Sequence, residues 1–302
     1  MSFQPDMPVS GAIARLFIYP VKSCAGVEVE QALLTESGLD LDRAWMVVDS
    51  DGMFVTQREE PRMALIRPQI KTEELVLRAP GMLALHLTID AVEAPTTVTV
   101  WQDTLAAWDM GAIAAQWLTD FLGRPCRLAR FDPDVERVAD SAWTSGAKVL
   151  HQFADGFPLL VLSEASLEGL NERLASAGHA SAQIERFRPN VVVSGMAAHD
   201  EDRIDSLWIR GEDEGKSESD MPPDINRDVH LQHVKPCARC AIPDIDPTNA
   251  AASHSVSDTL QVYRQDRRLG GAVTFGMNAI VRGGTGHMLR VGQLVKANWR
   301  FD

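Results

Sequence analysis

The sequence predicts a mainly β (α+β) protein, a β-barrel or β-sandwich chain with a few short helices. One observation is that short segments rich in β-branched residues recur at close spacing between turn residues. A second is that several of these segments alternate apolar and polar residues, which is typical of antiparallel sheets rather than βαβ units. A third is that helical periodicity is confined to a few segments.

The first part of the chain is predicted to consist largely of strands. Residues 13–20 are apolar and end in a proline, and residues 43–57 have the pattern of a hairpin whose turn is the Asp-Gly pair at 51–52. Residues 83–89 alternate between apolar and polar, and residues 96–101 are rich in β-branched side chains. These segments predict an antiparallel sheet.

Two segments have helical spacing. Residues 111–125 place apolar side chains on one helical face, with Asp109 as the candidate N-cap and Gly123 as the stop. Residues 163–175 place leucines on one face, with Ser163 as the candidate N-cap. We expect a short helix at each place.

The length of 302 residues is compatible with two domains. The run between residues 123 and 150 is polar and irregular, so we expect the boundary there, and strands return at 190–195 and 205–211. Residues 211–228 are strongly charged, lack aromatic side chains and contain a Pro-Pro pair. This composition predicts a mobile acidic insertion between two strands.

The net charge of −13 argues against a nucleic-acid partner, which requires a large basic surface. The sequence contains neither an apolar stretch long enough to span a membrane nor the pattern of a signal peptide at its start. We therefore expect a cytoplasmic protein with reduced thiols. A local basic pocket is still possible, because basic residues recur in short separate motifs: Lys22, Arg43, Arg58, Arg62, Arg188 and Arg239.

Two of the four cysteines, Cys237 and Cys240, lie three positions apart in one loop, with Arg239 between them. Half of a zinc site would need two more soft ligands, and Cys24 and Cys126 lack the paired spacing. A mixed Cys/His site stays open, with its further ligands from His230, His233 or His254. A thioredoxin-type redox pair would open a helix, which the prolines that follow disfavour. A structural disulfide is disfavoured in the cytosol, and two ordinary buried thiols fit poorly in a polar, proline-rich setting.

Another interpretation is a thiolate ligand. Lys235 and Arg239 would favour the thiolate by charge attraction, and a thiolate is a soft ligand for a transition metal. A single thiolate can complete a metal whose other ligands come from a bound organic cofactor. The basic motifs could then hold a phosphate of that cofactor, since arginine forms paired bonds to phosphate oxygens.

Six motifs occur in an order that resembles the MOSC-domain family (molybdenum cofactor sulfurase C-terminal domain). The motifs are YPVKSCAGVEV, LDRAWMVVD, VTQREEPRMALI, SEASLEGLN, FRPNVVVSG and CARC with a later Asp-Pro. The resemblance extends over residues 11–299 and is closest to the amidoxime-reducing-component-like branch. It implies an N-terminal MOSC β-barrel domain at 10–125 and a MOSC β-barrel domain at 126–302.

The resemblance also implies a molybdenum–molybdopterin cofactor bound between the two domains. Cys240, the second cysteine of the pair, matches the family's molybdenum ligand and catalytic residue, and Cys237 would only shape the loop. Ala238 departs from the usual serine, and Gly156 and Phe157 depart from polar residues that contact the cofactor in the mitochondrial relatives. The implied cofactor contacts are Lys22, Ser23, Arg43, Arg188, Asn190, Ala238 and Arg239.

The activity implied by the resemblance is the reduction of N-hydroxylated compounds such as amidoximes, hydroxylamines and N-hydroxylated bases. Electrons would come from a separate ferredoxin- or cytochrome-like donor with its reductase, because neither clustered ferredoxin cysteines nor a dinucleotide-binding fingerprint is visible. The alternative is a sulfur carrier that holds a persulfide, or a cofactor-binding module without reductase activity.

Four further residues are expected to pack in the core rather than in the site: Cys24, Cys126, Trp45 and Trp101.

Overall fold

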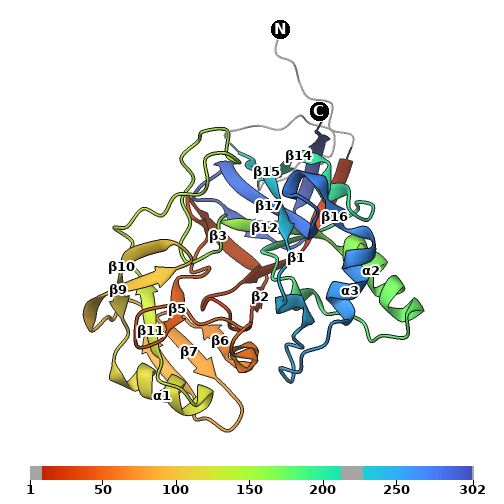
Figure 1. Cartoon of the computed structure of the whole chain (residues 1–302). Coiled ribbons are helices and arrows are strands. Elements are labelled where there is room, and N and C mark those ends of the chain that lie inside the picture. The colour runs from red at the N-terminus through yellow and green to blue at the C-terminus, as the bar shows by residue number, and fades with distance from the viewer. Residues whose placement is uncertain (1–8, 212–226, 301–302) are drawn as a thin grey trace.

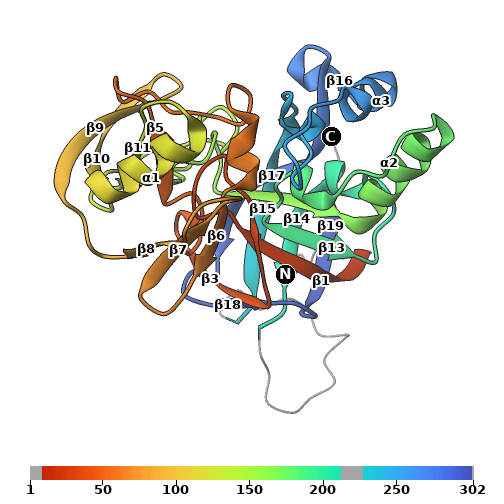
Figure 2. The same cartoon turned by 90° about the horizontal axis from the view of Figure 1, so that it is seen from below.

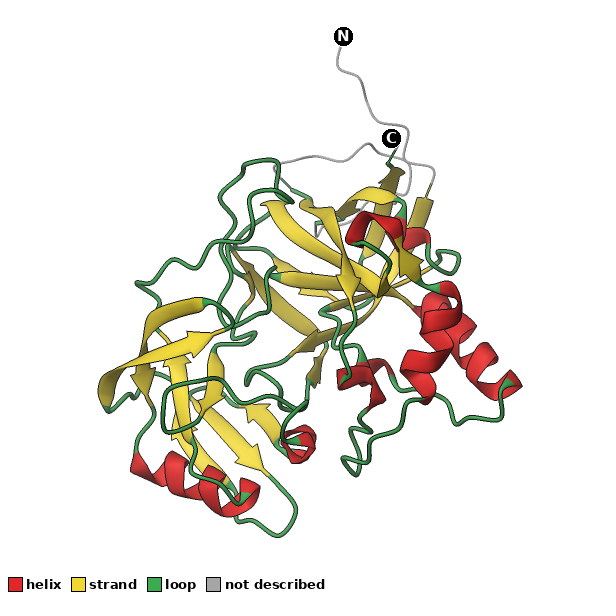
Figure 3. Ribbon diagram, in the orientation of Figure 1, coloured by secondary structure: helices red, strands yellow, loops and turns green. Residues whose placement is uncertain are grey.

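The computed structural model describes residues 9–211 and 227–300, and it confirms the mainly β prediction (Figures 1 and 3). The described residues contain nineteen strands and three α-helices. No helix among them is long and apolar enough to cross a membrane. The insertion expected at 211–228 lies almost entirely outside the described residues.

Seven strands form a closed barrel in the order β12-β13-β1-β19-β14-β15-β17, because β17 also pairs with β12. Only the β12–β13 pair is parallel. Closure leaves no unpaired edge among these strands. Their bounds are β1 Val9–Ile18, β12 Leu159–Ser163, β13 Val191–Ser194, β14 Ile204–Ile209, β15 Val229–Ala238, β17 Ala272–Gly283 and β19 Leu294–Trp299.

The barrel interior is an apolar core to which the first strand contributes directly. Ile13 and Leu16 of β1 are buried in one cluster with Leu207 of β14 and Leu231 of β15. Residues 9–39 thus pack with the later part of the chain. The predicted boundary between an N-terminal domain at 10–125 and a second domain at 126–302 stays a prediction. The short strands around the barrel are β2 Val27–Val29, β3 Gln31–Thr35, β4 Gly38–Leu39, β16 Gln265–Asp266 and β18 Met288–Arg290.

Residues 45–131 form a second lobe, which contains two smaller sheets and is seen at the lower left of Figure 1. Its four-stranded sheet has the order β5-β11-β10-β9, and its three-stranded sheet has the order β6-β7-β8. The strands are β5 Trp45–Val48, β6 Arg67–Ile70, β7 Glu74–Arg78, β8 Leu85–Thr88, β9 Ala94–Val100, β10 Asp103–Asp109 and β11 Arg127–Phe131. The strands expected at 83–89 and 96–101 are therefore confirmed.

Three α-helices cover the sheets: α1 Ala112–Leu122, α2 Glu164–Ser176 and α3 Ser255–Tyr263. Helix α1 packs on the core of the second lobe, while α2 and α3 lie side by side against the outside of the barrel (Figure 2). Helix α3 had not been predicted. Short 3₁₀ helices occupy Pro61–Leu65, Ile184–Arg186, Asp200–Asp202, Ile242–Asp244 and Arg267–Leu269.

The caps of the two predicted helices differ in outcome. The Ser163 hydroxyl accepts a hydrogen bond from the Ser166 N–H at 3.1 Å and caps α2 as expected. Gly123 ends α1 with a left-handed φ of 74°, also as expected. Asp109 as N-cap was wrong, because α1 begins after Gly111 and Asp109 is the last residue of β10. Its carboxylate is held instead by an ion pair with Arg127.

The hairpin predicted at 43–57 forms only in part. Strand β5 and a turn exist, since the Gly52 N–H donates to the Asp49 carbonyl at 3.1 Å. The returning residues make only isolated bridges, in which Phe54 faces Val48 and Met53 faces Thr99. The two arms are still joined on either side of Phe54, since the Asp49 N–H donates to the Met53 carbonyl and the Val55 N–H to the Val47 carbonyl, both at 2.9 Å. The Phe54 N–H faces away from β5 and donates to the Thr99 carbonyl.

Candidate functional site

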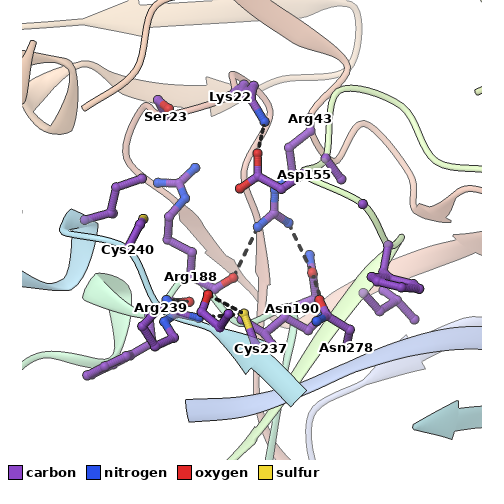
Figure 4. A pocket seen from close by; sticks show the side chains of 18 residues that line it. Lys22, Ser23, Arg43, Asp155, Arg188, Asn190, Cys237, Arg239, Cys240 and Asn278 are labelled. Carbon is purple, nitrogen blue, oxygen red and sulfur yellow. Dashed lines mark hydrogen bonds and ion pairs between the residues drawn. The ribbon is translucent and has the colours of Figure 1, made fainter. Parts of the chain in front are cut away.

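All eight predicted site residues line one pocket of about 120 Å³, which we call the narrow pocket (Figure 4). They come from five places along the chain. These are the loop after β1, the turn just before β5, the residues before β13, the last residue of β15 and the loop that follows β15. Their roles as cofactor contacts stay predictions. The residues are Lys22, Ser23, Arg43, Arg188, Asn190, Ala238, Arg239 and Cys240.

Three of these residues have backbones in the left-handed region. The φ angles are 64° for Ser23, 52° for Arg43 and 58° for Arg188. This conformation costs residues other than glycine roughly 1–2 kcal/mol each and persists only where the surroundings enforce it. Its concentration at one pocket indicates that the fold tolerates strain to place these side chains.

Arg43 and Arg188 lie on the ring of the buried Tyr19, with guanidinium carbons 4.4 and 4.3 Å from its centroid. Arg43 is held by the Asp42 carboxylate at 2.5 Å and donates to the Asn190 side-chain oxygen at 3.1 Å. It also donates to the Arg188 carbonyl at 3.2 Å. Arg43 therefore fixes the segment that carries Arg188 and Asn190.

Arg188 retains unused hydrogen-bonding capacity. Its Nη1 donates to the Cys24 carbonyl at 2.5 Å, whereas its buried Nη2 has no hydrogen-bond partner among the described residues. Burial, and next the charge of Arg43, lower the pKa of Arg188 to about 10. The guanidinium is still protonated at neutral pH, so this part of the pocket is cationic and lacks an acceptor.

Arg239 directly follows β15, and its side chain contacts a different cysteine from the one expected. Its guanidinium donates to the Phe187 carbonyl at 2.9 Å and to the Cys237 sulfur at 3.0 Å, rather than to Cys240. Its buried Nε has no partner among the described residues. The Lys235 ammonium lies over the rings of Trp143 and Phe157, and its expected effect on the thiols stays a prediction.

The two thiols of the loop occupy different environments. Cys237 is half-buried within β15, whereas Cys240 follows the strand and is exposed. Cys237 thus lies in the strand that leads into the loop, and its expected role in shaping the loop stays a prediction. In the described part of the chain, no three side chains of His, Cys, Asp or Glu are placed to hold a metal ion. A metal at Cys240 would therefore need further ligands from a bound cofactor.

Asp155 is a site residue that the sequence did not reveal. The buried Lys22 ammonium donates to its carboxylate at 2.5 Å and to the Phe153 carbonyl at 2.8 Å. The Asp155 side chain is exposed, and the charge and hydrogen bond of Lys22 outweigh its partial desolvation and lower its pKa. The available signal was its position next to Gly156 and Phe157, which also line the narrow pocket.

A second, wider hollow of about 970 Å³ adjoins the narrow pocket, which we call the wide hollow. Both include Asp155, Ala238 and Cys240, so the exposed thiol lies where the two meet. The second lobe contributes further lining residues: Met53, Phe54, Arg58 and Trp101. The site is thus built between the barrel and the second lobe.

The expectation that Trp101 packs in the core was wrong, because 44% of its surface is exposed and it lines the wide hollow. Trp45, Cys24 and Cys126 are buried as expected. Burial raises the pKa of the Cys24 thiol to about 12, which is consistent with a packing role.

Two sequence models of known domains match this chain. The sequence model of the MOSC N-terminal beta barrel domain matches residues 10–125, and that of the MOSC domain matches residues 148–296. The chain belongs to the MOSC-domain family, as its motifs had indicated.

Within this family the chain is similar to amidoxime-reducing components. It is 36% identical to mitochondrial amidoxime-reducing component 1 of Homo sapiens over 268 residues, which is 84% of this chain and 72% of that protein. It is 33% identical to the human component 2 over 264 residues, with the same coverage. It is also 28% identical to the molybdenum cofactor sulfurase of Bos taurus, over 85% of this chain and 29% of that protein.

Proposed function

We propose that this protein is a molybdenum-cofactor-dependent oxidoreductase that reduces N-hydroxylated compounds, with amidoximes, hydroxylamines and N-hydroxylated bases as substrates. The main support is the position of the exposed Cys240 thiol, at the edge of a cationic pocket and facing a second hollow. The similarity to proteins named amidoxime-reducing components supports the same activity.

The described residues of the narrow pocket suit a cofactor with a phosphate group. Four cations and one carboxylate line it: Lys22, Arg43, Arg188, Arg239 and Asp155. The unpartnered Arg188 Nη2 and Arg239 Nε are buried donors, which cost free energy unless an acceptor is bound. A phosphate would supply such acceptors.

Some pocket residues would contact the cofactor directly, and others would hold the pocket in shape. Arg188 and Arg239 have free donors and would contact the phosphate directly. Arg43 and Lys22 are occupied by Asp42, Asp155 and backbone carbonyls, so they would mainly hold the pocket in shape. Ala238 can offer only its backbone, and Cys240 would hold the metal through its thiolate.

When bound, the cofactor would supply the two-electron chemistry by which an N–OH group, two electrons and two protons give N–H and water. Cys240 would fix the reacting centre where the narrow pocket opens into the wide hollow. Asp155 has a lowered pKa and is ionised at neutral pH, so it would accept hydrogen bonds there rather than donate a proton. The electrons would come from a separate ferredoxin- or cytochrome-like protein with its reductase. The cytoplasmic location stays a prediction.

A sulfur-carrier function is the second candidate. The exposed Cys240 could hold a persulfide without metal, and the similarity to a molybdenum cofactor sulfurase favours this alternative. Elemental analysis of protein made in a molybdopterin-competent host distinguishes the two. Stoichiometric molybdenum is expected for the reductase, whereas metal-free protein with labile sulfane sulfur is expected for the carrier.

The direct test compares Cys240→Ala with Cys237→Ala. Loss of the thiolate in Cys240→Ala should nearly abolish amidoxime reduction while the circular dichroism spectrum is retained, because the side chain is exposed. Cys237→Ala should keep most of the activity, since the thiol contacts Arg239 and the Ala238 carbonyl but is not the proposed metal ligand. Equal and complete loss in both variants would indicate a dithiol site and contradict the proposal.

A further inference from the structure

Trp101 has a backbone conformation that does not suit it. It is the first of the two residues that connect β9 to β10, since Val100 pairs with Asp103. Its φ is 57°, in the left-handed region where such turns prefer glycine, asparagine or aspartate. A bulky aromatic residue in this region is a conformational outlier, and such strain is typically retained at functional sites.

Contacts from two parts of the molecule hold Trp101 in place. Its indole Nε1 donates to the Asp155 carboxylate at 3.0 Å, the same group that binds Lys22 in the narrow pocket. Its ring packs at 58° against Phe54 with centroids 5.0 Å apart, and the Arg58 guanidinium lies 4.5 Å above it. The ring is therefore oriented relative to the site from both the second lobe and the barrel side.

These contacts do not bury the ring. Trp101 keeps 44% of its surface exposed and lines the wide hollow together with Cys240. A residue that served only to tie the lobes together would need the indole N–H but not an exposed aromatic surface. Because the side chain is a planar and largely apolar indole, the part that Arg58 and Phe54 leave exposed suits contact with a planar aromatic ligand.

We infer that Trp101 determines substrate specificity, by packing its exposed ring against N-hydroxylated substrates that carry a planar aromatic group, in preference to small aliphatic ones. This inference rests on the proposed function, because it treats Cys240 as the position of the reacting centre. Phe54 and Arg58 hold the ring, and Asp155 sets its orientation.

The test uses the full chain loaded with molybdenum, an artificial electron donor and two amidoximes with the same reacting group, benzamidoxime and acetamidoxime. Trp101→Gly suits the positive φ and removes the ring, so the melting temperature should not fall markedly. We expect the KM for benzamidoxime to rise about 3- to 10-fold, as for loss of one aromatic contact, and the KM for acetamidoxime to stay unchanged. Trp101→Phe keeps a ring and should behave nearly as the wild type.

Two outcomes would overturn the inference. Equal changes in KM for both amidoximes would show that the ring does not discriminate. Trp101→Phe behaving as Trp101→Gly would show that the indole N–H to Asp155 matters instead of the ring.

A binding measurement separates this inference from the proposed function. Calorimetry of the isolated protein should show that benzamidine binds more tightly than acetamidine, and that Trp101→Gly removes the difference. If wild-type protein with stoichiometric molybdenum reduces neither amidoxime while this difference is present, the reductase proposal fails and the aromatic site stands. If the difference is absent, the aromatic site fails whatever the activity.

Discussion

Replacing Arg188 by alanine tests whether the cationic pocket holds a phosphate. In the wild type the buried Nη2 of Arg188 lacks an acceptor among the described residues, and a bound phosphate would provide one. A hydrogen bond to a charged group contributes about 1.5–3 kcal/mol. Its loss should therefore raise the dissociation constant of the cofactor about 10- to 150-fold.

The assay measures molybdenum by elemental analysis and pterin by fluorescence after oxidation, in protein purified from one host. Arg186→Ala is the matched control, because Arg186 is a buried guanidinium on the same segment that pairs with Asp246. It is not among the described residues that line the narrow pocket. Circular dichroism should show both variants folded, with cofactor content lowered only in Arg188→Ala.

The reasoning is refuted if Arg188→Ala retains molybdenum and pterin at the wild-type level. Equal losses in both arginine variants would also refute it, because they would reflect a general loosening of the segment rather than a missing phosphate contact. Arg188→Lys adds a further check, since it keeps the charge but not the paired geometry of a guanidinium. We expect its cofactor content to lie between those of the wild type and Arg188→Ala.

Two further predictions concern stability. Because Lys22 lowers the pKa of Asp155, the ionised carboxylate stabilises the fold above its ordinary pKa of about 4, and this contribution is lost as the pH falls through the lower folded value. Chemical unfolding should therefore show Asp155→Asn less stable than the wild type at pH 7, with a gap that narrows toward pH 2; a constant gap would contradict the ion pair. Ser163→Ala should lower the free energy of unfolding by at least about 1 kcal/mol, because the hydroxyl caps α2 and also donates to the buried Glu201 at 3.0 Å. Urea titration checks this, and an unchanged midpoint would argue against the cap.

The sequence by itself determined the features that depend on neighbouring residues. Alternation over 83–89 and 96–101 predicted β8 and β9, because a strand with one buried face needs a period of two. The cap at Ser163 was predictable because its partner, Ser166, is three residues away. The site residues were found through short ordered motifs that the family shares, and the fold brings all eight into one pocket.

Only the tertiary structure decided the features that depend on distant partners. The residues after the turn that follows β5 also bridge to β9, since the Phe54 N–H donates to the carbonyl of Thr99, forty-five positions further along. Asp109 ends β10 two residues before the helix, where its carboxylate accepts from the Gly111 N–H and also pairs with the distant Arg127. Arg239 contacts Cys237 rather than Cys240. Trp101, which was expected in the core, instead donates a hydrogen bond to Asp155. Local periodicity and spacing carry no information on such contacts, since their energies depend on which segments the barrel and the second lobe bring together.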